Sequence, residues 1–284
     1  MKAWVPSHIT GFFAAKRQDD PQKSGSIGCG LALALGATTT IETSPKTDPK
    51  ADPKTEIVLN GQVSEAPVSR YVVDRLARSP VRVNTVLEMP FGAGFGASGA
   101  GALGCAYALN AHFDLGLTAN QAAAVAHVAE VTNRTGLGDV MGQNTGGLVI
   151  RLKPGAPGIG QADRIPILPL KVEYVVRGPI STKEVLSDEA MMKAVNTAGE
   201  AALKDLLKRP KLRDFMLLSR RFTMQAGLAS DWALDAIEAV EAAGGMASMI
   251  MLGDAVFSFG GYPALSSFGE VHSTIISQRG ANLD

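Results

Sequence analysis

A glycine-rich segment between a predicted strand and a predicted helix constrains this chain more than any other feature. It runs from Pro90 to Ala100 with the sequence Pro-Phe-Gly-Ala-Gly-Phe-Gly-Ala-Ser-Gly-Ala. Glycine adopts positive φ and lets a backbone approach a ligand closely. The start of a helix leaves unpaired amides at the positive end of its dipole, an arrangement that binds phosphate. The segment therefore predicts a phosphate-binding loop, with close packing of the helix on a sheet as the structural alternative.

The spacing of the glycines leaves more than one phosphate ligand open. Gly94, Gly96 and Gly99 match the dinucleotide-binding pattern, and Asp114 follows Gly94 by 20 residues (94 to 114). In a Rossmann site that acid ends a second strand, whereas the intervening residues here have the pattern of one helix. A P-loop requires Gly-Lys-Ser/Thr, which the sequence lacks. A dehydrogenase that binds NAD at Gly94 remains the less favoured reading.

Composition and charge describe an ordinary globular chain of 284 residues, with 46% hydrophobic and 19% charged side chains. Lys+Arg and Asp+Glu are 27 each, so the net charge of 0 argues against nucleic acid or an anionic membrane as partner. The N-terminus lacks the apolar core of a signal peptide, and no apolar run reaches the ~18 residues of a membrane span. Cys29 and Cys105 lie among small apolar residues and are expected to be buried and reduced. These features predict a cytoplasmic protein.

Strand and helix patterns alternate without a regular βαβ rhythm, which predicts an α+β fold. Strands are expected at 2–5 (ending at Pro6), 31–43, 57–61, 81–87, 148–151 and 167–176. Helices are expected at 68–78, 97–112, 118–131 (with a Thr118 capping box), 188–208, 211–225 and 230–243, and apolar segments at 246–258 and 271–277. Residues 44–54 are predicted to form the long tip of a hairpin, and 135–147 a loop. Pro154–Gly158 is predicted to separate domains at 1–153 and 160–284.

Glu130 and Asp139 provide the acidic groups of a candidate active site. Glu130 ends a predicted helix, and Asp139 lies in a glycine-bearing turn nine residues later (130 to 139). Phosphoryl transfer from ATP requires Mg²⁺ on the phosphate oxygens and a carboxylate that orients or deprotonates the acceptor hydroxyl. Mg²⁺ prefers oxygen ligands and keeps several waters, so Glu130 and Ser98 would suffice as its protein ligands. A solvated helix residue and a turn former are the structural alternatives for the two acids.

The glycine segment resembles the second motif of the GHMP kinases, whose common form is Pro-x-x-x-Gly-Leu-Gly-Ser-Ser-Ala. The chain differs from that form at Phe95, Ala97 and Gly99 and keeps Ser98. The resemblance implies a two-domain GHMP kinase-like fold, with an N-terminal S5 domain 2-like α/β sandwich and a C-terminal ferredoxin-like α+β domain. It also implies that Ser98 and Glu130 bind Mg²⁺ and that Asp139 is the catalytic carboxylate. The ATP-binding residues that it implies are Pro90, Gly92, Gly94, Gly96, Ala97, Ser98 and Gly99.

Further motifs are similar to those of the archaeal pantoate kinase branch of the GHMP kinases. They lie at 6–13 (Pro-Ser-His-Ile-Thr-Gly-Phe-Phe), in a predicted loop at 24–30, at 135–143 and at 251–257. The resemblance implies ATP-dependent phosphorylation of the 4-hydroxyl of (R)-pantoate in coenzyme A biosynthesis. A third GHMP motif would fall on Gly244–Ser248, where the match is poor.

Pantoate carries one carboxylate, hydroxyls and geminal methyl groups, so its site requires a cation, hydroxyls and an apolar wall. The candidate substrate residues are His8, Thr10, Ser26, Arg134 and Arg151. Homoserine, mevalonate or shikimate remain alternative substrates, and a nucleotide-binding module without catalysis is the alternative outside enzymes. The sequence does not fix the oligomeric state, and a homodimer is compatible with it.

Overall fold

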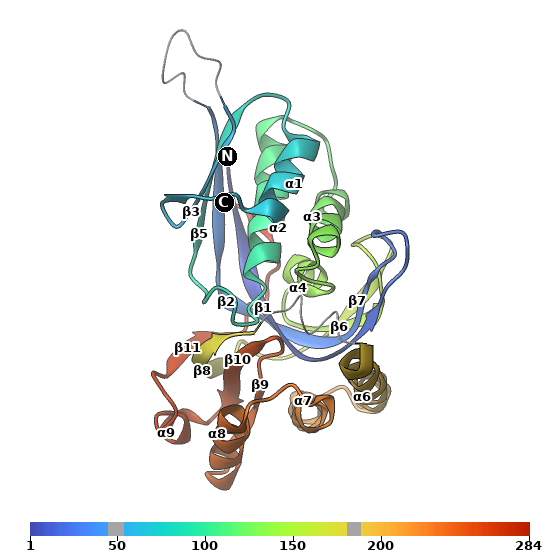
Figure 1. Cartoon of the computed structure of the whole chain (residues 1–284), viewed down its shortest axis with the longest axis vertical. Coiled ribbons are helices and arrows are strands. Elements are labelled where there is room, and N and C mark those ends of the chain that lie inside the picture. The colour runs from blue at the N-terminus through green and yellow to red at the C-terminus, as the bar shows by residue number, and fades with distance from the viewer. Residues whose placement is uncertain (45–53, 181–188) are drawn as a thin grey trace.

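The computed structural model describes residues 1–44, 54–180 and 189–284, which form two β-sheets with helices packed on them (Figure 1). The larger sheet has the strand order β12 (Asn282–Leu283), β1 (Lys2–Lys16), β2 (Gly25–Thr43), β5 (Val81–Leu87), β3 (Glu56–Leu59) and β4 (Gln62–Val63). A branch of this sheet adds β6 (Leu148–Lys153) beside β2, and β7 (Gln161–Ile165) beside β6. The smaller sheet has the order β11 (His272–Ile275), β8 (Lys171–Pro179), β10 (Gly253–Phe259) and β9 (Met246–Met249).

The two longest strands, β1 and β2, form an antiparallel hairpin that runs through most of the molecule (Figure 1). The prediction that a strand ends at Pro6 is wrong, because a register shift between Pro6 and Ser7 lets β1 continue past the proline. The loop expected at 24–30 is also wrong from Gly25 onward, since these residues form the start of β2. The motif at 6–13 therefore lies on a buried strand rather than beside a loop.

The sheet order corrects the hairpin expected between residues 31–43 and 57–61. Strand β5 lies between β2 and β3, pairing antiparallel with β2 and parallel with β3. Of the loop expected at 44–54, residues 45–53 lie outside the described residues.

Six of the described helices lie close to predicted positions: α1 (Pro67–Leu76), α2 (Ala97–His112), α3 (Ala119–Asn133), α6 (Glu189–Lys208), α7 (Leu212–Ala226) and α8 (Asp231–Ala242). Two short helices, α4 (Asp139–Thr145) and α9 (Tyr262–Leu265), lie where no helix was predicted. The capping box of α3 is confirmed, with Thr118 accepting from the Gln121 amide. The loop expected at 135–147 is wrong in part, because α4 begins at Asp139, whose charge favours the first turn of a helix.

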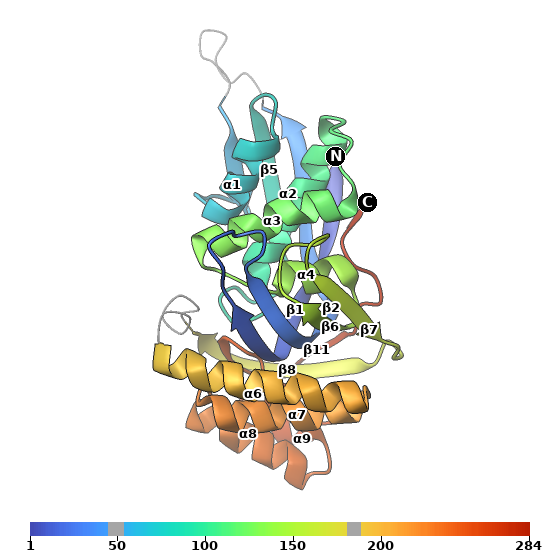
Figure 2. The same cartoon turned by 90° about the vertical axis from the view of Figure 1, so that its right-hand side faces the viewer.

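The helices cover the sheets in two groups (Figures 1 and 2). Helices α1, α2 and α3 lie on one face of the upper part of the larger sheet, and α6, α7 and α8 are stacked at the other end of the molecule. A cluster of buried aromatic rings joins β1 to α7 and the smaller sheet, because Phe12 packs on Phe215 and Phe222, and Phe215 packs on Phe257. The hydrophobic core is therefore continuous from the first strand to the C-terminal sheet.

Helix α6 approaches β1 so closely that a glycine is required at the contact. A Cβ on Gly199 would clash with the carbonyl oxygen of Phe13. We expect Gly199→Ala to lower the free energy of unfolding by about 1–3 kcal/mol, despite the better helix propensity of alanine. Urea denaturation measures the change. Gly178→Ala is the matched control, because no atom of the described residues lies within 4 Å of a Cβ there; equal stability of the two variants would contradict the prediction.

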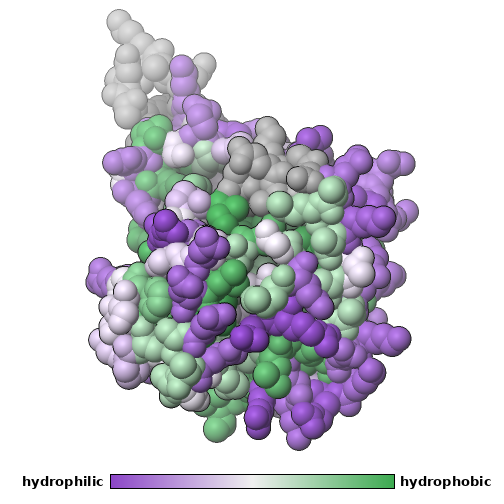
Figure 3. Space-filling model, turned by 60° about the horizontal axis from the view of Figure 1, so that its bottom comes forward, coloured by the Kyte–Doolittle hydropathy of each residue, from purple (hydrophilic) through white to green (hydrophobic). Residues whose placement is uncertain are grey.

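The surface at the lower end of the molecule is hydrophilic with smaller hydrophobic areas between (Figure 3). Ion pairs such as Arg209–Asp214 and Arg221–Asp205 lie on or beside α6 and α7. Within the described ranges, no helix combines the length and apolar character needed to cross a bilayer. Cys29 and Cys105 are buried and unpaired, as predicted.

The predicted division at 154–158 stays a prediction. Strand β7 follows that segment and still pairs with β6 of the larger sheet, and β12 near the C-terminus pairs with β1. The chain thus leaves the larger sheet after β7 and returns to it at its end.

Candidate functional site

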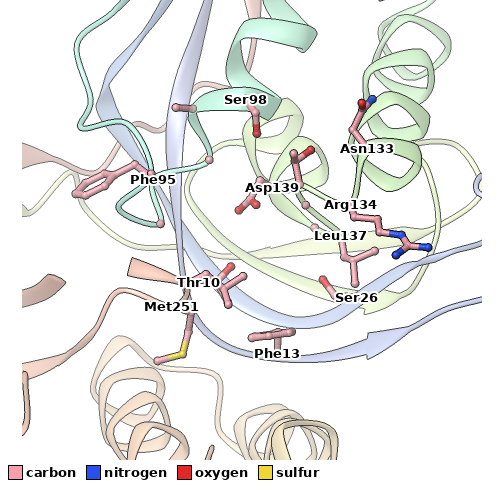
Figure 4. A pocket seen from close by; sticks show the side chains of 18 of the residues that line it. Thr10, Phe13, Ser26, Phe95, Ser98, Asn133, Arg134, Leu137, Asp139 and Met251 are labelled. Atoms are coloured by element: carbon pink, nitrogen blue, oxygen red, sulfur yellow. The ribbon is translucent and has the colours of Figure 1, made fainter. Parts of the chain in front are cut away.

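A cavity of about 330 Å³ lies where the glycine-rich segment, the α3–α4 connection and the first two strands meet (Figure 4). From the glycine-rich segment it is lined by Gly92, Gly94, Gly96, Ala97 and Ser98. The other predicted site residues on its wall are Thr10, Ser26, Arg134, Asp139 and Arg151. Four predicted residues do not line the wall: Pro90, Gly99, Glu130 and His8. Glu130 and His8 nevertheless contact residues that do, Gly136 and Asp139 respectively. The structure therefore brings the predicted residues together.

The glycine-rich segment has the backbone expected of a phosphate-binding loop. Gly92, Gly94 and Gly96 all have positive φ (77°, 82° and 66°), which favours glycine at each. The first intrahelical bond of α2 runs from the Ala100 amide to the Gly96 carbonyl. The amides of the preceding turn have no intrahelical acceptor, and they lie at the positive end of the α2 dipole beside the cavity.

Contacts with β1 and the smaller sheet hold this loop in place. The His8 amide donates to the Phe95 carbonyl at 3.1 Å, and the Phe95 ring packs edge-on against Tyr174 of β8 with centroids 5.0 Å apart. A Cβ on Gly94 would lie 2.5 Å from the carbonyl oxygen of Met251. The phenylalanine that departs from the GHMP form therefore anchors the loop, with its ring packed against Tyr174 at the edge of the cavity (Figure 4).

The contact with Met251 comes from the turn between β9 and β10 and not from 244–248, where the sequence has its poor match to the third motif. The turn that meets the glycine-rich segment is 250–253, where a Cβ on Gly253 would clash with the Ala93 carbonyl. At 244–248, by contrast, Ser248 is buried against Thr223 at 3.1 Å, away from the cavity wall.

Both candidate acids face the glycine-rich segment. Asp139 is the first residue of α4, and a Cβ on Gly96 would lie 3.2 Å from its Cγ. Glu130 comes from the last turn of α3, and its Oε2 would lie 3.3 Å from a Cβ on Gly99. In Figure 4 the side chains of Ser98 and Asp139 point into the same space. The arrangement meets the central requirement of a kinase site, a carboxylate opposite the phosphate-binding loop.

Burial dominates the electrostatics of Glu130. It raises the pKa of this carboxyl to about 7, and the neighbouring charge of Asp139 adds to the rise. Hydrogen bonds from the Thr135 hydroxyl, at 2.6 Å, and from Ser98 lower the pKa in part. A buried carboxylate with two hydroxyls and a second carboxylate near it is a suitable ligand for a cation.

This raised pKa predicts a pH-dependent stability in Mg²⁺-free protein. Between the ordinary pKa of 4.5 and about 7 the folded state binds the Glu130 proton more tightly than the unfolded state. The stabilising contribution is thus complete below 4.5 and is lost as pH rises through 7, by up to about 3 kcal/mol. Glu130→Gln should flatten this fall when urea denaturation is followed from pH 4.5 to 8. An identical pH profile in the variant would contradict the assignment.

A buried chain of polar side chains lies behind Asp139. His8 is 0% exposed, and its Nδ1 lies 2.8 Å from Asp139 Oδ1. Its Nε2 lies 3.4 Å from Nη1 of Arg151, whose Nη2 in turn donates to the Thr10 hydroxyl at 3.4 Å. Arg151 is 2% exposed, and its Nε has no hydrogen-bond partner among the residues that the structure describes. His8 therefore contacts the acid rather than the cavity.

The remaining substrate candidates lie at the floor and rim of the cavity. Ser26 is buried, and a Cβ on Gly138 would clash with its hydroxyl and lie 2.7 Å from Arg151 Nε. Arg134 is exposed at the C-cap of α3 with φ 57°, a left-handed conformation. The two candidate arginines therefore differ in environment, because Arg151 is buried and Arg134 is exposed to solvent.

Sequence reasoning missed Gln143 as part of this assembly. It is buried on α4, and its Nε2 donates to the Gly96 carbonyl at 2.8 Å, which ties α4 to the glycine-rich segment. Gln143 is the last residue of the motif at 135–143, and its place in that motif was the one sequence feature that could have identified it. Packing explains why three other positions of the motif are glycine. A Cβ at Gly136, Gly138 or Gly142 would clash with Glu130, Ser26 or His8, respectively.

The donor set fits Mg²⁺ rather than a tightly held transition metal. Among the residues that the structure describes, no group of three or more His, Cys, Asp or Glu side chains could hold a metal ion. Glu130 and Ser98 supply a carboxylate and a hydroxyl, the oxygen ligands that Mg²⁺ shares with waters and substrate phosphates.

Comparisons with known proteins agree with this geometry. Residues 66–147 match the family model described as GHMP kinases N terminal domain. A pantoate kinase from Thermococcus kodakarensis is 39% identical over 91% of this chain and 87% of its own length. One from Methanospirillum hungatei is 34% identical over 98% of this chain and 94% of its own length.

A solved structure described as a phosphotransferase related to the CoA biosynthesis pathway is similar along its whole length. It is 33% identical, has a TM-score of 0.88, and covers 100% of this chain and 98% of its own. Both the α+β class and the GHMP kinase-like fold expected from the sequence are confirmed, and the fold contains two sheets. GHMP kinases transfer phosphate from ATP with Mg²⁺ to small molecules. With full-length similarity in both sequence and structure, the chain belongs to the GHMP kinases and, among them, to the family of the pantoate kinases.

Proposed function

We propose that this protein phosphorylates the 4-hydroxyl of (R)-pantoate with ATP, a step of coenzyme A biosynthesis. One observation carries the proposal: the glycine-rich loop and Asp139 face each other across a cavity that also contains a buried arginine, Arg151. A phosphate-binding loop, a carboxylate and a desolvated cation are what transfer of phosphate to a hydroxy acid requires.

The ATP phosphates would lie along residues 92–99, held by the amides of the first turn of α2. Glu130 and Ser98 would hold Mg²⁺, which neutralises charge on the phosphate oxygens. Pro90 sets the entry into the loop, and Gly99 lets α2 approach Glu130 without a Cβ between them.

The pantoate carboxylate would bind to Arg151, with Ser26 and Thr10 donating hydrogen bonds beside it. The support is the unpartnered Nε of Arg151, because a buried donor without an acceptor is costly unless a ligand supplies one. Phe13, Leu137 and Met251 line the same cavity and offer an apolar wall for the geminal methyls (Figure 4). Arg134, at the rim, would attract the two anionic substrates.

Asp139 would accept a hydrogen bond from the 4-hydroxyl and take its proton as the oxygen bonds to the γ-phosphorus. The bond from that phosphorus to the bridging oxygen breaks, and ADP leaves with the electron pair. His8 already occupies Oδ1 of Asp139, which leaves Oδ2 for the hydroxyl. The residues around the cavity would thus account for substrate binding, attack by the hydroxyl and proton transfer.

A coupled assay of ADP release tests the proposal directly. Purified protein with ATP and Mg²⁺ is offered pantoate, homoserine, mevalonate or shikimate, and ³¹P NMR identifies the product. We expect ADP release with pantoate far above the other three, because a site with a buried guanidinium and hydroxyls discriminates strongly against a mismatched partner. Turnover of another acceptor in its place would reassign the substrate, and ATP binding without turnover would indicate a non-catalytic nucleotide-binding module.

A further inference from the structure

We propose that His8 is a positioning residue that acts as a neutral imidazole, protonated only at Nδ1, and connects the substrate-binding Arg151 to the base Asp139. The inference rests on the proposed function, since it assigns how the cavity's carboxylate is held for the acceptor hydroxyl. It replaces the earlier expectation that His8 binds a substrate hydroxyl, because this ring is buried behind Asp139.

The contacts on the two ring nitrogens define the tautomer. An ionised carboxylate only accepts hydrogen bonds, so the 2.8 Å contact to Asp139 Oδ1 requires a proton on Nδ1. A guanidinium only donates, so the 3.4 Å contact to Arg151 Nη1 requires a lone pair on Nε2. Only the neutral ring protonated at Nδ1 satisfies both contacts, whereas an imidazolium would place a second buried cation against Arg151.

The charged groups around the ring agree with this assignment. Burial lowers the pKa of His8, and Arg151 lowers it further, while Asp139 acts in the opposite direction. Helix α4 packs directly on the ring, because a Cβ on Gly142 would clash with His8 Cδ2. The imidazole is therefore confined between the guanidinium, the carboxylate and a glycine backbone.

This placement gives His8 a function that neither neighbour has alone. Its Nδ1–H holds Oδ1 of Asp139, so the second oxygen keeps a fixed direction toward the acceptor hydroxyl. Its Nε2 holds one amino group of the arginine that would bind the substrate carboxylate. The imidazole ring thus fixes the distance between the substrate carboxylate at Arg151 and the carboxylate of Asp139. We therefore expect His8 to affect kcat and not the affinity for ATP.

The first test reads the tautomer in the unmodified protein without substrate. With ¹⁵N-labelled histidine at pH 7, we expect the His8 Nδ1 shift of a protonated ring nitrogen and the Nε2 shift of an unprotonated one. His127 is an internal comparison of opposite tautomer, because its Nε2 lies 2.8 Å from the carbonyl oxygen of Ser24 and must carry the proton. An imidazolium or an Nε2-protonated His8 would overturn the proposal. The spectrum does not depend on which substrate the enzyme uses, so it separates this failure from a failure of the proposed function.

The second test follows kcat and KM once turnover of the unmodified protein is established. His8→Ala should lower kcat by about 10²-fold with little change in KM for ATP. His8→Asn should recover part of the loss, since its side-chain amide can donate to Asp139 as Nδ1–H does. His112→Asn, at the C-terminal end of α2 and off the cavity wall, is the matched control.

A double-mutant cycle distinguishes positioning from a general structural effect. In an Asp139→Asn background, His8→Ala should lower kcat much less than in the unmodified protein, because its effect passes through Asp139. Equal losses in the two backgrounds would overturn the proposal. If His8→Ala fails to fold, the tautomer of His8 measured in the unmodified protein still supports or overturns the proposal.

Discussion

Replacing Asp139 with asparagine is expected to lower kcat by about 10³-fold or more, the loss typical of removing a catalytic carboxylate. Asparagine keeps the size of the side chain, and its carbonyl can still accept from His8 Nδ1–H. It cannot take the proton of the acceptor hydroxyl. Because residues 92–99 and Glu130 are untouched, ATP affinity in the presence of Mg²⁺ should stay close to that of the unmodified protein.

Saturating turnover and calorimetric ATP binding measure the two quantities separately. Asp114→Asn is the matched control: it makes the same chemical change off the cavity wall, at φ 49°, where asparagine is also tolerated. Its kcat should equal that of the unmodified protein. A near-normal kcat in Asp139→Asn would remove Asp139 from the reaction.

The second large effect concerns Arg151. We expect Arg151→Met to lower kcat/KM for pantoate by about 10³-fold, because a buried partner of a charged group contributes about 2–5 kcal/mol to binding. Methionine fills a similar volume, so the fold is retained while the guanidinium contacts to His8 and Thr10 are lost. Arg151→Lys should recover little, since an ammonium cannot reproduce the planar set of donors.

Initial rates at varied pantoate, with ATP saturating, give the effect, and the KM for ATP should change little. Arg82→Met removes an arginine from the larger sheet that pairs with Glu56 at 3.3 Å and lies off the cavity wall. It is the matched control and should be neutral. An unchanged KM and kcat for pantoate in Arg151→Met would place the substrate carboxylate elsewhere.

The parts of this structure that the sequence predicted are those with local causes. Helices α2 and α3 begin where a glycine-rich turn and a Thr118 capping box start them, and both are recognisable in a few residues. The glycine-rich segment and the two acids were found because phosphate and Mg²⁺ chemistry demand particular residue types. The structure places the glycine-rich segment and Asp139 on the wall of one cavity, with Glu130 buried beside Gly136 and Asp139.

The parts that the sequence did not predict depend on distant partners. The passage of β1 through Pro6 relies on a register shift against β2, which no local pattern encodes. The insertion of β5 between β2 and β3 likewise depends on which distant strands pair, and local sequence patterns do not specify that pairing. The sequence predicts that His8 binds the substrate, since it does not show which way the ring of a histidine points. Only the packing of α4 on β1 places that ring behind the acid.

The contacts of β1 have a mechanical consequence. Over three residues this strand bonds the glycine-rich segment through the His8 amide, Asp139 through the His8 ring, and the turn at Met251 through the Thr10 carbonyl. Three separate segments around the cavity are thus tied to one short stretch of a single strand. A substitution that displaces the backbone of this stretch would therefore shift all three segments together.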